Sequence, residues 1–228
     1  MKRFYKEVSV GEGNGVLLDG KTVKTPRGAA LVLPAQALAE AVAEEWRAQG
    51  EEIVPVDMPL TKLANTAIDG ITRRRVEVVD EIIAYARHDH LCYRTDEPAE
   101  LVARQSAAWD PLLDWAAERY GAPLVVVQGV TSVAQPEESI AALRNAVEAF
   151  DPFALAPLHV AASICGSLVL ALAMTDKRLT AEEAFTLSQL DERYQAEKWG
   201  SDSEAEARAK RLAAELAAAA RFMDLSRA

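Results

Sequence analysis

Cysteine and basic residues are scarce in this chain, and each shortage excludes a class of protein. The 228 residues include only two cysteines, Cys92 and Cys165, so a disulfide-stapled secreted scaffold is excluded and both are expected to be reduced thiols. The 25 lysines and arginines are outnumbered by 35 aspartates and glutamates, which gives a formal net charge of −10. Such an acidic chain repels phosphate backbones and anionic lipid surfaces. We therefore expect no nucleic-acid partner, whereas a basic polypeptide surface would suit this charge.

Long apolar segments are missing as well. Residues Met1–Glu7 contain no apolar signal core and lack the Arg-rich, acid-poor character of a mitochondrial presequence. The most apolar run, Leu158–Met174, is interrupted by a histidine, a glycine and two serines and is at the short limit for spanning a bilayer. We expect a buried core helix there and no membrane insertion. We expect a cytoplasmic protein of a bacterium, or a mitochondrial matrix protein if the chain is a trimmed eukaryotic form, and we expect it to be a monomer.

What the chain has in quantity is apolar side chains: half of the residues are hydrophobic, enough to bury a core. The first third is predicted to be rich in β-structure. Val16–Leu18 and Lys21–Thr25 flank Asp19-Gly20, a pair typical of a two-residue hairpin turn. A further strand is predicted at Ala30–Leu33. An amphipathic helix is predicted at 35–49, where apolar residues recur every four positions.

Helical periodicity dominates from about residue 60 onward. A short β-branched run at 124–127 is predicted to be a strand. Thr180–Glu183 forms a capping box that opens a predicted helix reaching Trp199, and an alanine-rich helix follows Gly200. The expected fold class is α+β. Residues 1–66 would form a small α/β domain with antiparallel hairpins, and residues 67–228 a larger, mainly helical domain.

Gly15–Thr22 matches the phosphate-loop pattern letter for letter. A true phosphate loop needs a buried strand before it and a helix beginning at the lysine, so that backbone donors point at phosphate. Here Lys21 is followed by alternating, β-branched residues and then by Pro26, which would disrupt that helix. The hairpin is the better interpretation, and a nucleotide hydrolase that uses Gly15–Thr22 is kept as an alternative.

Two imidazoles and a thiol alternate at His88, His90 and Cys92, which would share one face of a strand and could bind zinc in a hydrolase. The same residues would diverge on a helix, and a polar turn is the simpler interpretation. No Gly-x-Ser-x-Gly elbow is present in the sequence, and neither cysteine has a recognisable active-site setting. The third histidine, His159, is expected to be a hydrogen-bonded core residue.

The stretch Leu187–Gly200 has two helical faces. One face is apolar and is expected to pack in the core. The other carries Glu192, Gln195 and Trp199 at offsets of three and seven residues, so that a carboxylate, an amide and an indole lie together. Tryptophan is favoured in binding hot spots, so this face is a candidate contact patch. The alternative is a half-buried tryptophan with solvated neighbours.

Several stretches resemble the family of assembly chaperones of the F-type ATP synthase α subunit. They match in order over nearly the whole chain, which makes the combination specific although no single piece is. The matching stretches are Leu18–Gly28, Ala43–Trp46, Met58–Asp69, Leu91–Arg94, Gly166–Ala173 and Leu190–Gly200.

The resemblance implies a non-enzymatic chaperone that binds the free α subunit until it assembles with the β subunit, without ATP hydrolysis and without a cofactor or metal. It implies that the acidic C-terminal helix is functional, with Asp191, Glu192, Gln195 and Trp199 as client-binding residues. Three further residues, Trp46, Gly20 and Pro26, are expected to serve the fold.

Overall fold

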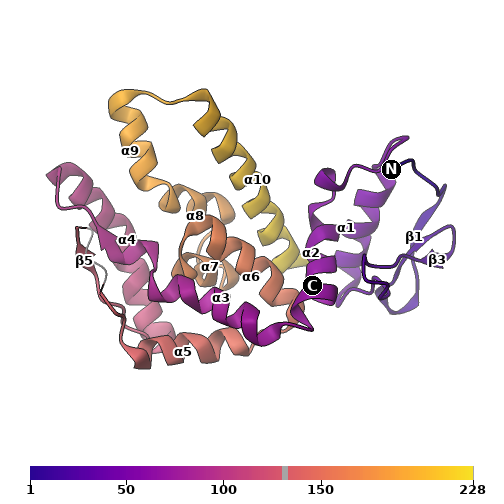
Figure 1. The fold of residues 1–228 in the computed structure, drawn as a ribbon, viewed down its shortest axis with the longest axis horizontal. Coiled ribbons are helices and arrows are strands. Elements are labelled where there is room, and N and C mark those ends of the chain that lie inside the picture. The colour runs from indigo at the N-terminus through magenta and orange to yellow at the C-terminus, as the bar shows by residue number, and fades with distance from the viewer. Residues whose placement is uncertain (130–132, 228) are drawn as a thin grey trace. The chain divides into compact units, whose positions relative to one another are not determined.

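The structure is a computed structural model that describes residues 1–129 and 133–227 (Figure 1). The chain divides into two compact units. Unit 1 contains Met1–Arg75, Phe150–Pro157 and Ala218–Ala228, and unit 2 contains Val76–Ala149 and Leu158–Ala217. A boundary at residues 66 and 67 stays a prediction. The predicted α+β class is confirmed, since two small sheets accompany a mainly helical chain.

Unit 1 begins with a three-stranded antiparallel sheet in the order β1-β2-β3, formed by Val8–Val10, Val16–Leu18 and Lys21–Thr22. Asp19 and Gly20 have φ angles of 47° and 76°, so both adopt the left-handed conformation that a tight hairpin turn between twisted strands requires. The predicted hairpin is confirmed. Because Lys21 lies in a strand and not at the start of a helix, the geometry of a phosphate loop is absent here.

The strand predicted at Ala30–Leu33 was wrong, because only isolated bridges form there. Leu31 donates its N–H to the carbonyl of Val23 and accepts from the N–H of Val16. Because its two backbone bonds go to two different residues, no continuous ladder forms with either segment. The helical prediction that follows was right. Unit 1 contains helix α1 at Gln36–Arg47, short 3-10 turns η1 at Glu12–Asn14 and η2 at Pro55–Asp57, helix α2 at Pro59–Asn65 and a π-helical turn η3 at Thr66–Ile71.

Unit 2 contains most of the remaining helices. In chain order the elements from residue 75 on are α3 (Arg75–Arg87), η4 (His90–Cys92), β4 (Tyr93–Arg94), α4 (Ala99–Tyr120), β5 (Val127–Gln128), α5 (Glu137–Glu148), α6 (Pro152–Cys165), α7 (Leu168–Thr175), α8 (Ala181–Ser188), α9 (Leu190–Trp199) and α10 (Ser203–Leu225). The two units divide α6 and α10 between them. Strands β4 and β5 pair in parallel.

The core of unit 2 is built around α7, whose eight residues are all buried. Most of the apolar run at 158–174 is buried as predicted, with Ser163 exposed, but it forms two helices and not one. Gly166, with a φ angle of 61°, makes the break between α6 and α7. Within 1–129 and 133–227, no helix combines the length and hydropathy that crossing a bilayer would require.

Two predictions of secondary structure need correction in unit 2. The capping box at Thr180 and Glu183 is present, but the helix it opens ends at Ser188. Gln189, with φ −107° and ψ 21°, leaves the helical conformation, and α9 starts anew at Leu190. The strand predicted at 124–127 shifts to Val127–Gln128, where β4 provides a partner.

Candidate functional site

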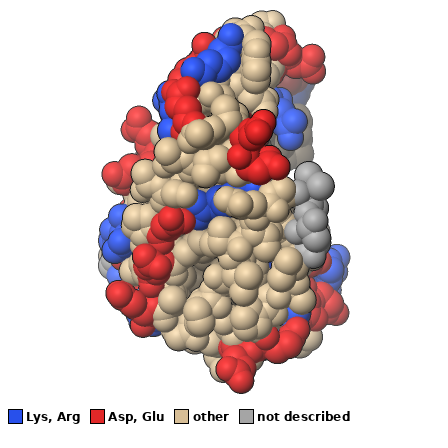
Figure 2. All heavy atoms as spheres, turned by 90° about the vertical axis from the view of Figure 1, so that its left-hand side faces the viewer, with Lys and Arg blue, Asp and Glu red and all other residues tan. Residues whose placement is uncertain are grey.

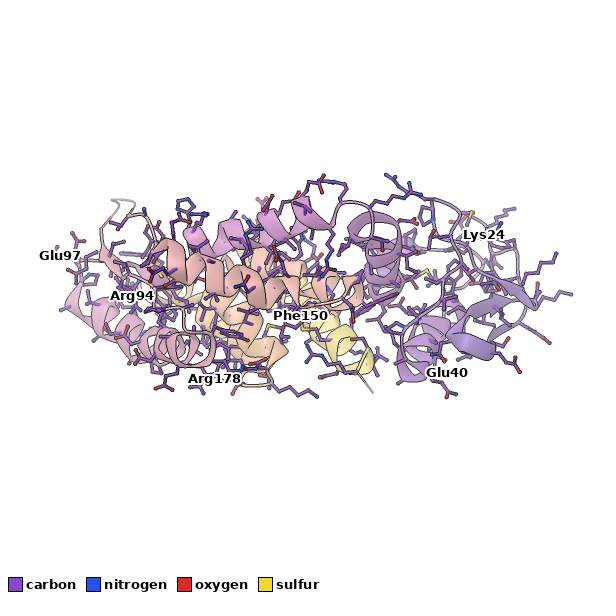
Figure 3. The ribbon with its side chains drawn as sticks, turned by 90° about the horizontal axis from the view of Figure 1, so that it is seen from below. Lys24, Glu40, Arg94, Glu97, Phe150 and Arg178 are labelled. Carbon is purple, nitrogen blue, oxygen red and sulfur yellow. The ribbon has the colours of Figure 1, made fainter. Side chains whose placement is uncertain are left out.

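Trp109 on α4 organises the part of unit 2 from which the candidate site is built. Its ring is fully buried, and its Nε1 donates to the carbonyl of Leu187 at 3.0 Å, which fixes the end of α8. The guanidinium of Arg94, labelled in Figure 3, lies 5.1 Å from the ring centroid, and the ring of His90 meets it edge-on at 5.0 Å. The Trp109 ring thus contacts the Leu187 carbonyl, the Arg94 guanidinium and the His90 ring, and these contacts fix α4, α8 and β4 relative to one another.

Gln105, one turn earlier on α4, connects that arrangement to α9. Its side chain is buried; Oε1 accepts from the N–H of Thr95 at 3.0 Å, and Nε2 donates to Oδ1 of Asp191 at 2.8 Å. Asp191 was predicted to bind a client, but the structure places it in this internal hydrogen bond. Because Asp191 lies in the first turn of α9, the contact also complements the positive end of the helix dipole.

A group of charged side chains attaches the rest of α9 to α4. Glu100 accepts from Nζ of Lys198 at 2.9 Å and from the hydroxyl of buried Tyr194 at 3.3 Å. Arg104 binds both Glu100 at 2.8 Å and Glu197 at 2.7 Å. The hydrogen bond from Lys198 lowers the pKa of the exposed Glu100 carboxyl. One side of α9 is therefore occupied by contacts to α4.

The other side of α9 points outward. Glu192 and Gln195 are exposed, and 78% of the surface of Trp199 is accessible to solvent. Among the described residues, none forms a hydrogen bond or ion pair with the side chain of Glu192, Gln195 or Trp199. The three residues that the helical spacing grouped together thus do share an open face, which we call the α9 face. An exposed indole beside a free carboxylate and a free amide offers apolar area and hydrogen bonds to a protein partner.

Figure 2 looks at the side of unit 2 on which α4, α9 and β5 lie in Figure 1. Uncharged residues occupy most of this side, acidic and basic residues lie around it, and a basic group lies near its middle. A broad uncharged area with a charged border is typical of a protein interaction surface.

The residues predicted to serve the fold lie in unit 1. Gly20 forms the hairpin turn described above. The ring of half-buried Trp46 meets that of Tyr5 at 5.7 Å, and its carbonyl accepts from the Tyr5 hydroxyl at 2.7 Å. Pro26 is exposed in a turn that Asp69 ties down by accepting from Thr25 Oγ1 at 2.7 Å and from a neighbouring backbone N–H at 3.0 Å.

Sequence reasoning missed a carboxylate that joins two of the resembling stretches. Glu45 on α1 accepts from the N–H groups of Leu60 and Thr61 and from the Thr61 hydroxyl, at 2.7 to 2.8 Å. It thereby caps the N-terminus of α2 from fifteen residues away. Burial raises the pKa of Glu45, and the three hydrogen bonds oppose that effect. The adjacent glutamate pair, Glu44-Glu45, gave no local signal that one member faces inward.

The segment considered for zinc binding also hides a carboxylate. Asp89 is fully buried and accepts from the N–H groups of Leu91 at 3.1 Å and Val169 at 3.0 Å, so it caps α7 across 80 residues. Burial raises its pKa to about 6. The position of Asp89 links the resembling stretches around Leu91 and Gly166, a connection that no local pattern indicated.

The metal-binding alternative does not assemble. Nδ1 of His88 lies 3.2 Å from the Tyr93 hydroxyl, His90 packs on Trp109, and Cys92 is buried with its pKa raised to about 12 by burial. Over 1–129 and 133–227, no three His, Cys, Asp or Glu side chains gather as metal ligands. The expectation for His159 was wrong: its side chain is one-third exposed, and Nε2 lies 3.3 Å from Glu81 Oε2 on α3.

The comparisons with known proteins agree with this architecture. The ATP12 chaperone protein family matches residues 2–117. The mitochondrial protein atp12 of Schizosaccharomyces pombe is 26% identical over 215 residues, which span 88% of this chain and 74% of that protein. The crystal structure of Atp12 from Paracoccus denitrificans is 42% identical with a TM-score of 0.93, covering 99% of this chain and 98% of its own. Atu1473 of Agrobacterium tumefaciens is 44% identical with a TM-score of 0.92, covering 98% of this chain and 85% of its own.

Proposed function

The chain belongs to the ATP12 chaperone family, and on that premise we propose that it is an ATP synthase assembly chaperone whose client is the free α subunit of the F-type enzyme. The chaperone would hold this subunit until the β subunit takes its place beside it. The observation that carries the proposal is the α9 face, where Trp199 is 78% exposed beside two unpaired polar side chains.

The physical need for such a chaperone follows from subunit assembly. A free subunit exposes apolar surface that its neighbour will later cover, and large patches of this kind aggregate. A chaperone must cover the patch tightly enough to protect it and weakly enough to release it. A Kd of about 0.1 to 10 μM, or about −10 to −7 kcal/mol, meets both demands.

The α9 face suits this task because it is held in place before a client arrives. Gln105, Trp109 and the Glu100 group fix the inner side of the region on α4, so that little conformational entropy is lost when the outer side binds. Trp199 supplies an apolar anchor, while Glu192 and Gln195 supply an acceptor and an amide at the same face. The acidic carboxylate and the net charge of −10 favour a basic surface on the client.

We propose further that the protein works without nucleotide, cofactor or metal and as a monomer, in the bacterial cytoplasm or in the mitochondrial matrix. Gly20 lies in the turn of the β2–β3 hairpin and Lys21 in strand β3, which supports chaperone action without ATP hydrolysis. The separation of His88, His90 and Cys92 likewise supports a role other than that of a zinc hydrolase.

A charge reversal on the α9 face tests the client site. Glu192→Lys should raise the Kd for the purified α subunit about tenfold or more, because it places a cation where a basic client surface would lie. The matched control is Glu118→Lys, which reverses an exposed carboxylate on α4 of the same unit. Binding is measured by isothermal titration calorimetry, and circular dichroism confirms that both variants are folded.

Each of the following results would decide part of the proposal. Weak binding by Glu192→Lys with normal binding by Glu118→Lys supports the α9 face as the client site. If both variants bind the α subunit as tightly as the unmodified protein does, Glu192 is not part of the site, but the α subunit remains the client. If the unmodified protein does not bind the α subunit at all, the proposed client is wrong.

A further inference from the structure

Among the residues that the structure describes, strand β5 pairs along one of its two edges only, the edge that faces β4. Towards β4, the Cα atoms of Val127 and Gln128 pair with those of Tyr93 and Arg94, and the N–H of Gly129 donates to the carbonyl of Arg94 at 2.9 Å. The backbone hydrogen bonds of β5 that these pairs represent all run to β4.

The side chain of Gln135 extends this edge beyond the end of β4. Its Oε1 accepts from the N–H of Val125 at 2.7 Å, and its Nε2 donates to the carbonyl of Val125 at 3.0 Å. A primary amide has the same donor and acceptor as a peptide group. Gln135 therefore gives Val125 the pair of bonds that a residue of a neighbouring strand would give.

The opposite edge follows from the alternation of an extended chain, in which the backbone groups of successive residues point to opposite sides. Val125 and Gly129 are two steps apart from Val127, so all three point towards β4 and Gln135. The N–H and C=O groups of Val126 and Gln128 must then point the other way. Within the described part of the chain, no hydrogen bond is formed by the backbone of Val126 or by the N–H of Gln128.

The surroundings of this outer edge are apolar and open. Val125 is 40% exposed and Val126 is 43% exposed, and Gln128 is exposed as well. The side of unit 2 that carries β5 is largely uncharged (Figure 2). Folded proteins usually protect an edge strand with lysine, proline or a covering loop, because unpaired backbone groups between apolar side chains recruit further strands. In unit 1 the edge strand β3 carries Lys21. Neither residue of β5, Val127 or Gln128, is charged.

We propose that the outer edge of β5 binds an extended, apolar and uncharged segment of the client, which adds a strand to the β4–β5 sheet. This inference rests on the proposed function and specifies how part of the α subunit is recognised. Main-chain hydrogen bonds to Val126 and Gln128 would supply the bonding, and the exposed valines would contact alternate client side chains. An unpaired backbone edge fits an extended strand better than a helix, whose backbone groups are already paired within itself.

The edge is also connected to the α9 face. Thr95, which follows β4, donates its N–H to Gln105 at 3.0 Å, and the same Gln105 side chain donates to Asp191 of α9 at 2.8 Å. One buried amide thus fixes the positions of the sheet and of α9 on the same helix, α4. A client could contact both surfaces together, with a strand on β5 and a basic region on α9.

The test separates main-chain recognition from side-chain recognition at one position. Val126→Pro removes the outward N–H, and Val126→Ala keeps it while shortening the side chain. Val126→Lys keeps the N–H but places a charge on the edge, and it serves if the proline variant is not folded. With the purified α subunit as the probe, Val126→Pro and Val126→Lys should each raise the Kd about tenfold or more, and Val126→Ala about threefold or less.

Amide hydrogen exchange of the free protein, followed by NMR, tests the edge without any client. The amides of Val125 and Gly129 should exchange slowly, because they are hydrogen-bonded, whereas those of Val126 and Gln128 should exchange quickly. Slow exchange at Val126 and Gln128 would mean that the edge is already covered, and the inference would be overturned.

The binding results distinguish this inference from the proposed function. If the unmodified protein binds the α subunit and folded Val126→Pro and Val126→Lys bind equally well, strand addition is wrong while the client stands. If the unmodified protein does not bind the α subunit, the proposed function fails, and the inference about its recognition fails with it.

Discussion

The cap that Glu45 places on α2 gives a quantitative prediction for unit 1. Glu45→Ala removes three hydrogen bonds, those from the N–H groups of Leu60 and Thr61 and from the Thr61 hydroxyl. A net contribution of about 0.5 to 1.5 kcal/mol for each bond gives roughly 1.5 to 4.5 kcal/mol for the three. Burial of the carboxylate, which raises the pKa of Glu45, offsets part of that gain. We therefore expect the variant to lose about 2 kcal/mol of unfolding free energy.

For a chain of this size, about 2 kcal/mol corresponds to a fall in Tm of roughly 4 to 8 °C. The neighbouring Glu44→Ala is the matched control, because Glu44 is exposed and pairs with Arg47 on the surface at 3.0 Å. Such surface pairs contribute little, so its Tm should stay within about 1 °C of the original. Thermal unfolding followed by circular dichroism measures both. Equal Tm values for the two alanine variants would refute the capping role of Glu45.

Two further predictions concern protonation and nucleotide. The pKa of Asp89 is raised to about 6 by burial, above the ordinary value of 3.8, so the folded state binds a proton more readily than the unfolded state and stability should fall as pH rises from about 4 to about 6. The expected loss of unfolding free energy is about 3 kcal/mol, and it should be smaller in Asp89→Asn. Urea unfolding at pH 4 and pH 7 measures the loss in both proteins. Equal pH dependence in the two would contradict the role of Asp89. Thermal unfolding with millimolar ATP and Mg²⁺ should leave the Tm unchanged, because Gly15–Thr22 forms a hairpin, and a rise of several degrees would show that nucleotide binds the folded chain.

Local patterns predicted local structure well. Asp19-Gly20 between β-branched runs gave the hairpin, and the Thr180–Glu183 capping box gave the start of α8. The helical spacing of Glu192, Gln195 and Trp199 correctly grouped three exposed side chains on one helix. These signals depend on residues a few positions apart, so the sequence alone contains the necessary information.

What local patterns did not reveal has a common physical cause. The helix predicted up to Trp199 is broken at Gln189, where the end of α8 is held by a bond from Trp109 to Leu187. Asp191 had the same helical and acidic character as Glu192, yet a buried amide on α4 binds one and leaves the other exposed. Which of two adjacent carboxylates faces inward is decided by the neighbouring helix and not by the helix that carries them.

The sequence by itself determined the α+β class, the hairpin, most helix positions and the family to which the chain belongs. Only the tertiary structure decided that Glu45 caps α2, that Asp89 caps α7 and that, among the described residues, none pairs with the outer edge of β5. Hydrogen bonds within a helix or a tight turn join residues close in sequence, so periodicity reveals them. A buried carboxylate or amide can be satisfied by any partner that packing brings near, and several of these partners are distant in sequence: Leu60 lies 15 residues from Glu45, Val169 lies 80 from Asp89, and Asp191 lies 86 from Gln105.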